Sequence, residues 1–175
     1  MSAATRPSGK TQAQRLLERR GIDYQEIVFP ETIHDAVGVA AFAALPASEV
    51  YKTLVVLAGS SPALILEPAD AALDLKSAAR AMGVKRVEMA SHAQAEQLTG
   101  LQVGGISALA LTHKHWPVFL DRRAEGKETI VVSAGQRGRN LRLRVADFVE
   151  VTGARWIDAA REEGLRTPTP SPPPE

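Results

Sequence analysis

Two apolar, β-branched segments joined by a very short connection most constrain the fold of this chain. Residues 50–57 (VYKTLVVL) and 63–67 (ALILE) have the composition of strands, and Ser-Ser-Pro between them is typical of a turn. A connection this short allows an antiparallel hairpin, whereas parallel neighbours need a crossover of a dozen or more residues. The later segments 117–121 (PVFLD), 128–133 (ETIVVS) and 140–144 (NLRLR) are also predicted to be strands with short connections.

Helices are predicted between these strands. Residues 11–21 have a capping threonine, Thr11, and a terminating glycine, and residues 91–100 begin with a capping serine, Ser91. Further helices are expected at 34–45, 73–83, 145–151 and 154–163, and further strands at 22–29 and 85–90. This mixture favours an α/β chain of the α+β type, with a mixed, largely antiparallel sheet flanked by helices, over a doubly wound parallel sheet.

The length of 175 residues predicts one folded domain. We expect it to span residues 10–163, with a disordered N-terminus at 1–9 and a disordered, Pro-rich tail at 164–175. No apolar run is long enough to cross a bilayer, and the first residues lack the apolar centre of a signal peptide, so we expect a cytoplasmic protein without a membrane partner.

Composition excludes several kinds of chemistry. The chain has no cysteine, which removes a thiolate nucleophile, a thiolate zinc site and a disulfide. The net charge of +1 is not that of a protein that binds nucleic acid regardless of sequence. Residues 137–144 (RGRNLRLR) contain four arginines, which form either a basic patch or a solvated face. His113 and His115 could share one face of a strand, but no carboxylate lies close in sequence, so we expect no metal and no cofactor.

Three features point to a binding site. Lys52 interrupts the apolar strand 50–57, where an ammonium needs an anion, a polar pocket or an edge from which it reaches water. The adjacent glycines of GGIS (104–107) allow close backbone approach and leave amide N–H groups accessible, unless they form only a bulge or a turn. Asp121 and the SAGQRG segment (133–138) each end or follow a strand, where they either face a pocket or complete a turn.

The order of these blocks is that of a known family. VYKTLVV, LDLKSAARAMGVKRVEMA, TGLQVGGIS, VFLD and VVSAGQRG resemble, over residues 12–160, the YbaK-like aminoacyl-tRNA deacylases, a group that includes the Cys-tRNA(Pro) deacylases and is related to the editing domain of prolyl-tRNA synthetases. The resemblance implies a compact domain with a barrel-like sheet. It also implies hydrolysis of the ester that joins a wrong amino acid to the 3′ end of a tRNA, with Cys-tRNA(Pro) as the expected substrate.

The resemblance also assigns residues. It places Lys52 at the terminal adenosine and the glycine loop around the aminoacyl carbonyl, with Lys52, Gly104, Gly105 and Ser107 as the catalytic set. The implied substrate-binding residues are Phe29, Tyr51, Thr53, Ile106, Asp121, Ser133, Gly135, Arg137 and Gly138. For cysteine the implied mechanism is substrate-assisted: the substrate thiol attacks its own ester. The implied partners are mischarged tRNA and prolyl-tRNA synthetase, with the protein a monomer or weak homodimer.

Two departures from the family pattern bear on specificity. The family loop often reads GGISP with a glycine two residues later, where this chain has Ala108 and Ala110. An aromatic hydroxyl near the pocket of some Cys-tRNA(Pro) deacylases falls at Phe29, which has no hydroxyl. Other hypotheses therefore remain open: a deacylase for alanine or serine, or a non-catalytic module that binds tRNA or a nucleotide.

Overall fold

The computed structural model describes residues 9–162, so the predictions of disorder at the two ends lie outside it, apart from Gly9. The α-helices are α1 (Gln12–Arg19), α2 (Ala36–Phe42), α3 (Leu75–Met82), α4 (His92–Thr99) and α5 (Val145–Thr152). Three short 3-10 helices are η1 (Ala47–Glu49), η2 (Leu109–Lys114) and η3 (Arg122–Gly126). The strands are β1 (Gln25–Val28), β2 (Tyr51–Ala58), β3 (Ser61–Pro68), β4 (Ala71–Leu73), β5 (Val87–Met89), β6 (Val118–Asp121), β7 (Thr129–Gln136), β8 (Arg139–Arg144), β9 (Arg155–Ile157) and β10 (Ala160–Glu162).

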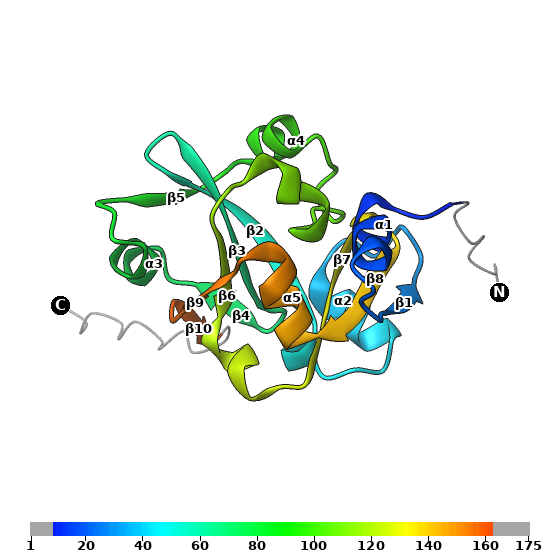
Figure 1. Ribbon diagram of the computed structural model, residues 1–175. Helices are drawn as coiled ribbons and strands as arrows, with labels where there is room; N and C mark the ends of the chain where they lie inside the picture. Colours follow the sequence, from blue (N-terminus) through cyan, green and yellow to red (C-terminus); the bar gives the residue numbers. More distant parts are fainter. Residues whose placement is uncertain (1–8, 163–175) are drawn as a thin grey trace.

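These strands form a mixed set of sheets. The largest has the order β5-β2-β3-β6-β9, in which β6 is parallel to β3 and β9 and the other pairs are antiparallel. A second sheet, β1-β8-β7, is antiparallel, and β10 pairs with β4. The predicted fold class is confirmed: the sheet is mixed and largely antiparallel, with helices around it (Figure 1).

The β2–β3 hairpin has the predicted position and a simple register. Ala58 pairs with Ser61 across the turn, and the pairing runs without a break to Tyr51 and Pro68. Alternate residues of these strands face two different cores. Tyr51, Val55, Leu64 and Leu66 belong to the main core, which also includes residues of α1, α5 and β7, whereas Val56, Ala63 and Ile65 pack with α3, β5 and β9.

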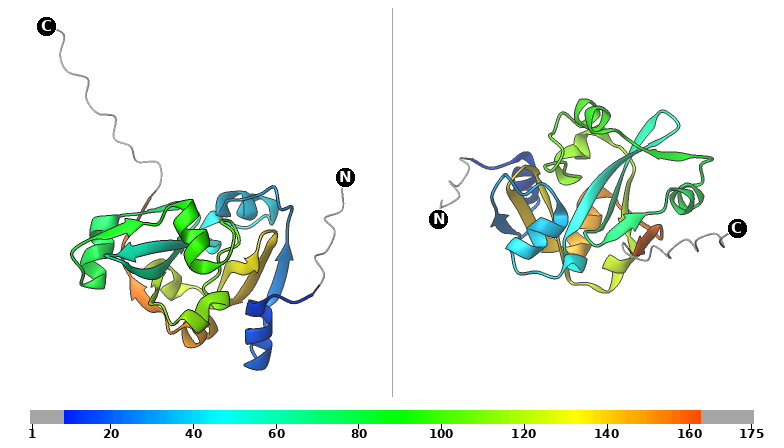
Figure 2. Two further views of the ribbon diagram at one scale, coloured as in Figure 1. Left: turned by 90° about the horizontal axis from the view of Figure 1, so that it is seen from above. Right: turned by 180° about the vertical axis from the view of Figure 1, so that it is seen from behind.

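The helices cover the sheets from different sides. Figure 1 shows α3 at one end of the molecule, α1 at the other, and α5 between them, and both views of Figure 2 keep this separation. The third apolar cluster lies under α2, where Val39 and Ala40 pack against Phe29, Val50 and Val131. A single parallel bridge between Val50 and Val131 joins the start of β2 to β7. Within residues 9–162, no helix is both long and apolar enough to cross a membrane.

Helix ends agree with the sequence-based predictions. Thr11 and Ser91 each accept a hydrogen bond from the third helical residue, and glutamines at those positions complete two capping boxes. Asp74 caps α3 in the same way, and Gly83 ends it at a φ of +70°.

The predicted helix over 154–163 is wrong. Residues 155–157 form β9, parallel to β6, and residues 160–162 form β10, antiparallel to β4. Trp156 and Ile157 lie opposite Leu120 and Asp121, so the segment continues an edge that β6 leaves open. Pairing with an available strand has outweighed the helix propensity of an Ala- and Glu-rich segment.

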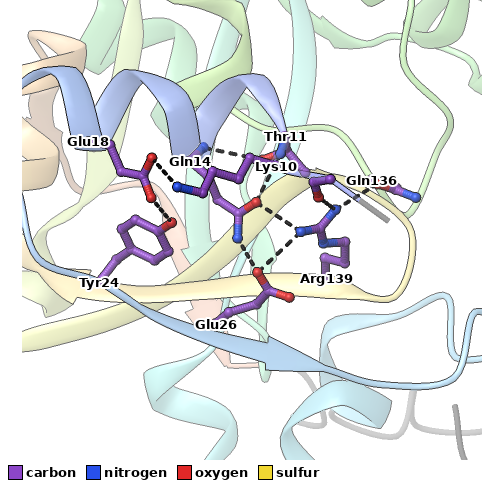
Figure 3. Close-up of polar contacts among 9 residues, drawn as sticks. Lys10, Thr11, Gln14, Glu18, Tyr24, Glu26, Gln136 and Arg139 are labelled. Carbon is purple, nitrogen blue, oxygen red and sulfur yellow. Dashed lines mark hydrogen bonds and ion pairs between the residues drawn. The ribbon is translucent and has the colours of Figure 1, made fainter. Parts of the chain in front are cut away.

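A buried polar network attaches α1 to the β7–β8 hairpin (Figure 3). The Arg139 guanidinium is 4% exposed and donates to the Gln14 side chain (2.9 Å), to Glu26 (3.2 Å) and to the carbonyl of Gly9 (2.8 Å). It also reaches the side-chain oxygen of Gln136 at the hairpin turn (3.2 Å). The network therefore links the N-terminal helix to the SAGQRG segment.

This network corrects the sequence-based view of the four arginines. Arg139 is buried, Arg142 is half-buried beside Glu49 (3.4 Å), and the Arg137 side chain bonds to the backbone of the glycine loop. Only Arg144 is exposed. The cluster is thus neither one basic patch nor one solvated face.

Candidate active site

A cavity of about 250 Å³ lies between α2, the start of β2, the glycine loop and the β7–β8 pair. We call it the α2–β2 cavity. The predicted site residues that line it are Phe29, Tyr51, Lys52, Thr53, Gly104, Ile106 and Ser133. Its other lining residues are Ile33, His34, Asp35, Ala36, Val39, Leu54, Val103 and Asn140. Residues from four separate parts of the sequence therefore meet around one mostly apolar hollow with a few polar groups, the usual character of a small-ligand site.

Lys52 has a carboxylate partner within the protein. It lies directly opposite Glu67 in the β2–β3 register, with 3.5 Å between its Nζ and the Glu67 Oε1. Its Nζ also donates to the carbonyl oxygen of Ala71 (2.5 Å). The Lys52 side chain is 28% exposed, so the ammonium is held on one side and remains accessible on another.

Glu67 is an unusual carboxylate. Only 1% of its surface is exposed, and neither carboxylate oxygen has a hydrogen-bond partner in the described part of the chain. Burial raises the pKa of Glu67 to about 6, although the nearby Lys52 ammonium acts in the opposite direction.

The two glycine-containing segments pack tightly against each other. A Cβ on Gly105 would lie 2.8 Å from the amide nitrogen of Arg137 and 3.0 Å from the carbonyl carbon of Gln136. The Arg137 side chain returns to donate from Nε to the carbonyl of Val103 (2.8 Å). Gly104 has a φ of +93°, which favours glycine. The loop shape therefore depends on both segments.

The amides of this loop differ in how they are used. The Gly105 N–H donates to the Gln102 carbonyl (2.8 Å) and closes a turn. Within residues 9–162, the N–H groups of Gly104 and Ile106 have no hydrogen-bond acceptor, and both residues line the cavity. Unused amides beside a cavity are available to a ligand oxygen.

Thr53 also has an unused polar group at the cavity. Its Oγ1 is buried and has no partner among the described residues. The edge of β2 beside it is open, because β5 pairs only with residues 56–58. A ligand in the cavity could satisfy this hydroxyl, whose burial is otherwise costly.

Comparison with known proteins identifies the fold and the family. The model of a family described as the aminoacyl-tRNA editing domain matches residues 30–151. The chain belongs to this family. EbsC of Enterococcus faecalis, named as a candidate Cys-tRNA(Pro)/Cys-tRNA(Cys) deacylase, is 31% identical over 157 residues, which cover 88% of this chain and 95% of EbsC. The expected family and enzyme class, an aminoacyl-tRNA hydrolase, are confirmed.

Solved structures agree on the fold. The hypothetical protein APE2540 has a TM-score of 0.78 and 24% identity, covering 86% of this chain and 99% of that one. A candidate trans-editing enzyme for prolyl-tRNA synthetase has a TM-score of 0.72 and 24% identity, covering 87% of this chain and 96% of that one.

Several expected site residues of this editing domain lie outside the cavity lining. The Ser107 hydroxyl is buried and accepts the N–H of Ala110 (3.3 Å) at the start of η2. Asp121 is buried at the end of β6 and accepts the N–H of Arg123 (2.9 Å). Burial raises the pKa of the Asp121 carboxyl. Asp121 is thus the N-cap of η3, and the Ser107 hydroxyl is bonded to the backbone at the start of η2.

Gly135 and Gly138 also lie outside the lining of the α2–β2 cavity. Gly138 has a φ of +83°, and its carbonyl accepts the N–H of Phe29 (2.9 Å). Gly135 lines a different cavity of about 480 Å³ between α1 and η2, which contains His113 but neither Lys52 nor the GGIS residues. Among the described residues, no group of three or more potential metal ligands exists around His113 or elsewhere.

The two alanines of the loop fit its backbone in this editing domain. Ala108 has a φ of −62°, which is the value that proline would impose. Ala110 packs against Gly135, so a Cβ added at that glycine would lie 3.0 Å from the Cβ of Ala110. The backbone at position 108 is therefore compatible with either alanine or proline.

Sequence reasoning missed His34 and Asn140 as cavity residues. His34 precedes Asp35, the N-cap of α2, and nothing in the sequence around a helix start marks it as a cavity residue. Asn140 lies directly across from Ser133, and both line the cavity. The available sequence signal for Asn140 was an asparagine, a residue that strands disfavour, at the head of a segment that alternates leucine and arginine.

Proposed function

We propose that this editing domain is a trans-acting deacylase that hydrolyses Cys-tRNA(Pro). The observation that carries the proposal is the meeting of Lys52, the Gly104 and Ile106 amides and the unpartnered Thr53 hydroxyl around one cavity. The relationship to EbsC supports cysteine as the amino acid. We further propose that it works in the cytoplasm and receives its substrate from prolyl-tRNA synthetase.

The nucleophile in this proposal is the substrate itself. The cysteinyl sulfur attacks the carbonyl carbon of its own ester, a C–S bond forms, and the C–O bond to the ribose breaks. The thiol proton ends on the ribose hydroxyl, and the amino acid leaves as a cyclic thioester. This reaction needs no nucleophile from the protein, which is consistent with a chain that has no cysteine.

The protein contributes position and charge stabilisation. We assign the Gly104 and Ile106 amides to the carbonyl oxygen as it becomes negative, a role worth roughly 10²–10³ in rate for a single donor. We assign Lys52 to the terminal adenosine, where its accessible side supplies a donor. Thr53 and Ser133 line the same cavity and would fix the orientation of the ester, which brings the reacting atoms together.

The test is the rate at which labelled amino acid is lost from Cys-, Ala- and Ser-charged tRNA(Pro). We expect a large acceleration over buffer with Cys-tRNA(Pro). Loss from none of the three would refute the proposal. Faster loss of alanine than of cysteine would make Ala-tRNA(Pro), and not Cys-tRNA(Pro), the substrate.

A further inference from the structure

Glu67 is a buried carboxylate to which the reaction above gives no part. It comes from β3, whereas the cavity is formed by β2, α2 and the loops, and it is not among the lining residues. Even so, it lies opposite Lys52 in the register and 3.5 Å from its ammonium.

We propose that Glu67 is the positioning residue that fixes the Lys52 ammonium at the edge of the α2–β2 cavity. The inference rests on the proposed function, since it gives Lys52 a place at the substrate. Lysine has a long, flexible stem and three N–H donors on one nitrogen. Glu67 and the Ala71 carbonyl hold that nitrogen from the β3–β4 side and leave a donor for the substrate.

A purely structural role explains Glu67 poorly. A carboxylate that is 1% exposed and has no hydrogen bond within residues 9–162 is costly to bury. An apolar residue of similar size would often serve the fold as well or better. The pair therefore has a clearer use in orienting a charged side chain than in holding two strands that are already fully paired.

The charged groups around Glu67 come from three elements. Lys52 of β2 favours the ionised form, Asp121 of β6 opposes it, and Arg123 of η3 favours it. Because burial raises the pKa of Glu67 to about 6, its negative charge is present at neutral pH and is lost as the pH falls through that value. The hold on Lys52 should weaken over the same pH range.

The test compares Glu67→Gln with Glu88→Gln. Glu88 of β5 is a matched control because it also pairs with a basic side chain, Arg86 (2.5 Å), but is exposed. The first measurement follows the ¹³Cε resonances of the six lysines between pH 4 and pH 8, with Lys52 assigned by Lys52→Arg. We expect the Lys52 resonance to shift with a midpoint near pH 6 in the wild type and in Glu88→Gln, and to show no such step in Glu67→Gln.

The second measurement is steady-state hydrolysis of Cys-tRNA(Pro) at pH 7.5. Glu67→Gln should raise KM about tenfold and change kcat little, because a Lys52 ammonium that is no longer held in place loses its charge-assisted hydrogen bond to the substrate. Its urea midpoint should equal or exceed that of the wild type, because a neutral side chain is cheaper to bury. A merely structural Glu67 would instead lose activity in proportion to stability.

Two results would overturn the proposal: a Lys52 resonance without a step near pH 6 in the wild type, or unchanged KM in Glu67→Gln. Absence of hydrolysis by the wild type would refute the proposed function, and the lysine resonance would then decide the role of Glu67 alone.

Discussion

The buried Glu67 should make the stability of this domain depend on pH in a particular direction. Its pKa in the folded protein is about 6, compared with 4.5 for an unperturbed glutamate. The folded protein thus binds this proton more tightly than the unfolded chain does. The contribution of Glu67 to the free energy of unfolding is therefore highest below pH 4.5 and is lost as the pH rises through 6.

The size of the effect follows from the two pKa values. A change of one pKa unit corresponds to about 1.4 kcal/mol, so Glu67 should cost about 2 kcal/mol of stability at pH 8 relative to pH 4. Glu67→Gln removes the titration and keeps the shape. The free energy of unfolding of the wild type minus that of Glu67→Gln should therefore decrease by about 2 kcal/mol from pH 4 to pH 8.

Urea unfolding at closely spaced pH values measures this difference directly, because other titrating groups are common to both proteins. Glu88→Gln provides the control, since its exposed carboxylate should give a nearly constant difference. A difference that stays flat, or that moves in favour of the wild type as the pH rises, would refute the reasoning. The latter would mean that Lys52 outweighs the cost of burial.

Three further substitutions test other parts of the structure. Arg139→Met should cost about 3–5 kcal/mol in urea unfolding, because it leaves buried acceptors of the Figure 3 network without their cation; a cost under about 1 kcal/mol would show that the network adds little. Gly105→Ala should cost about 1–3 kcal/mol and slow hydrolysis, since its Cβ meets the backbone of residues 136–137, whereas Gly126→Ala meets nothing within 4 Å; equal effects would contradict the tight packing of the loops. Lys52→Met should destabilise by about 3 kcal/mol at pH 8 and much less at pH 4, where Glu67 is neutral in either protein; the same loss at both pH values would exclude the ion pair as its cause.

Local signals were enough to predict much of the fold. Thr11, Ser91 and Gly83 act at helix ends as their residue types suggest, because capping depends only on neighbours in the chain. The segment 154–163 failed because its structure depends on strands far away in the sequence. Neither β4 nor the free edge of β6 can be seen from the Ala- and Glu-rich residues themselves.

The sequence was enough to predict which segments form the site, but not the contacts between them. Lys52, Gly104 and Ser133 do meet at one cavity, but the tight contact of Gly105 with residues 136–137 could not be derived from spacing. The pairing of Lys52 with Glu67 could, however, have been derived from the sequence. Once the hairpin turn is placed so that Ala58 faces Ser61, stepping six residues back along each strand pairs Lys52 with Glu67.

The measurement that tests the central claim most directly is single-turnover hydrolysis of Cys-tRNA(Pro) beside Ser-tRNA(Pro). The two substrates differ by one atom, sulfur in place of oxygen, and share the tRNA and the ester. A substrate thiol that attacks its own ester predicts that the cysteine ester is lost about 100-fold faster or more, because the reacting group is already held next to the carbonyl. Equal rates for the two esters would contradict the account, since they would require a nucleophile common to both, such as an activated water.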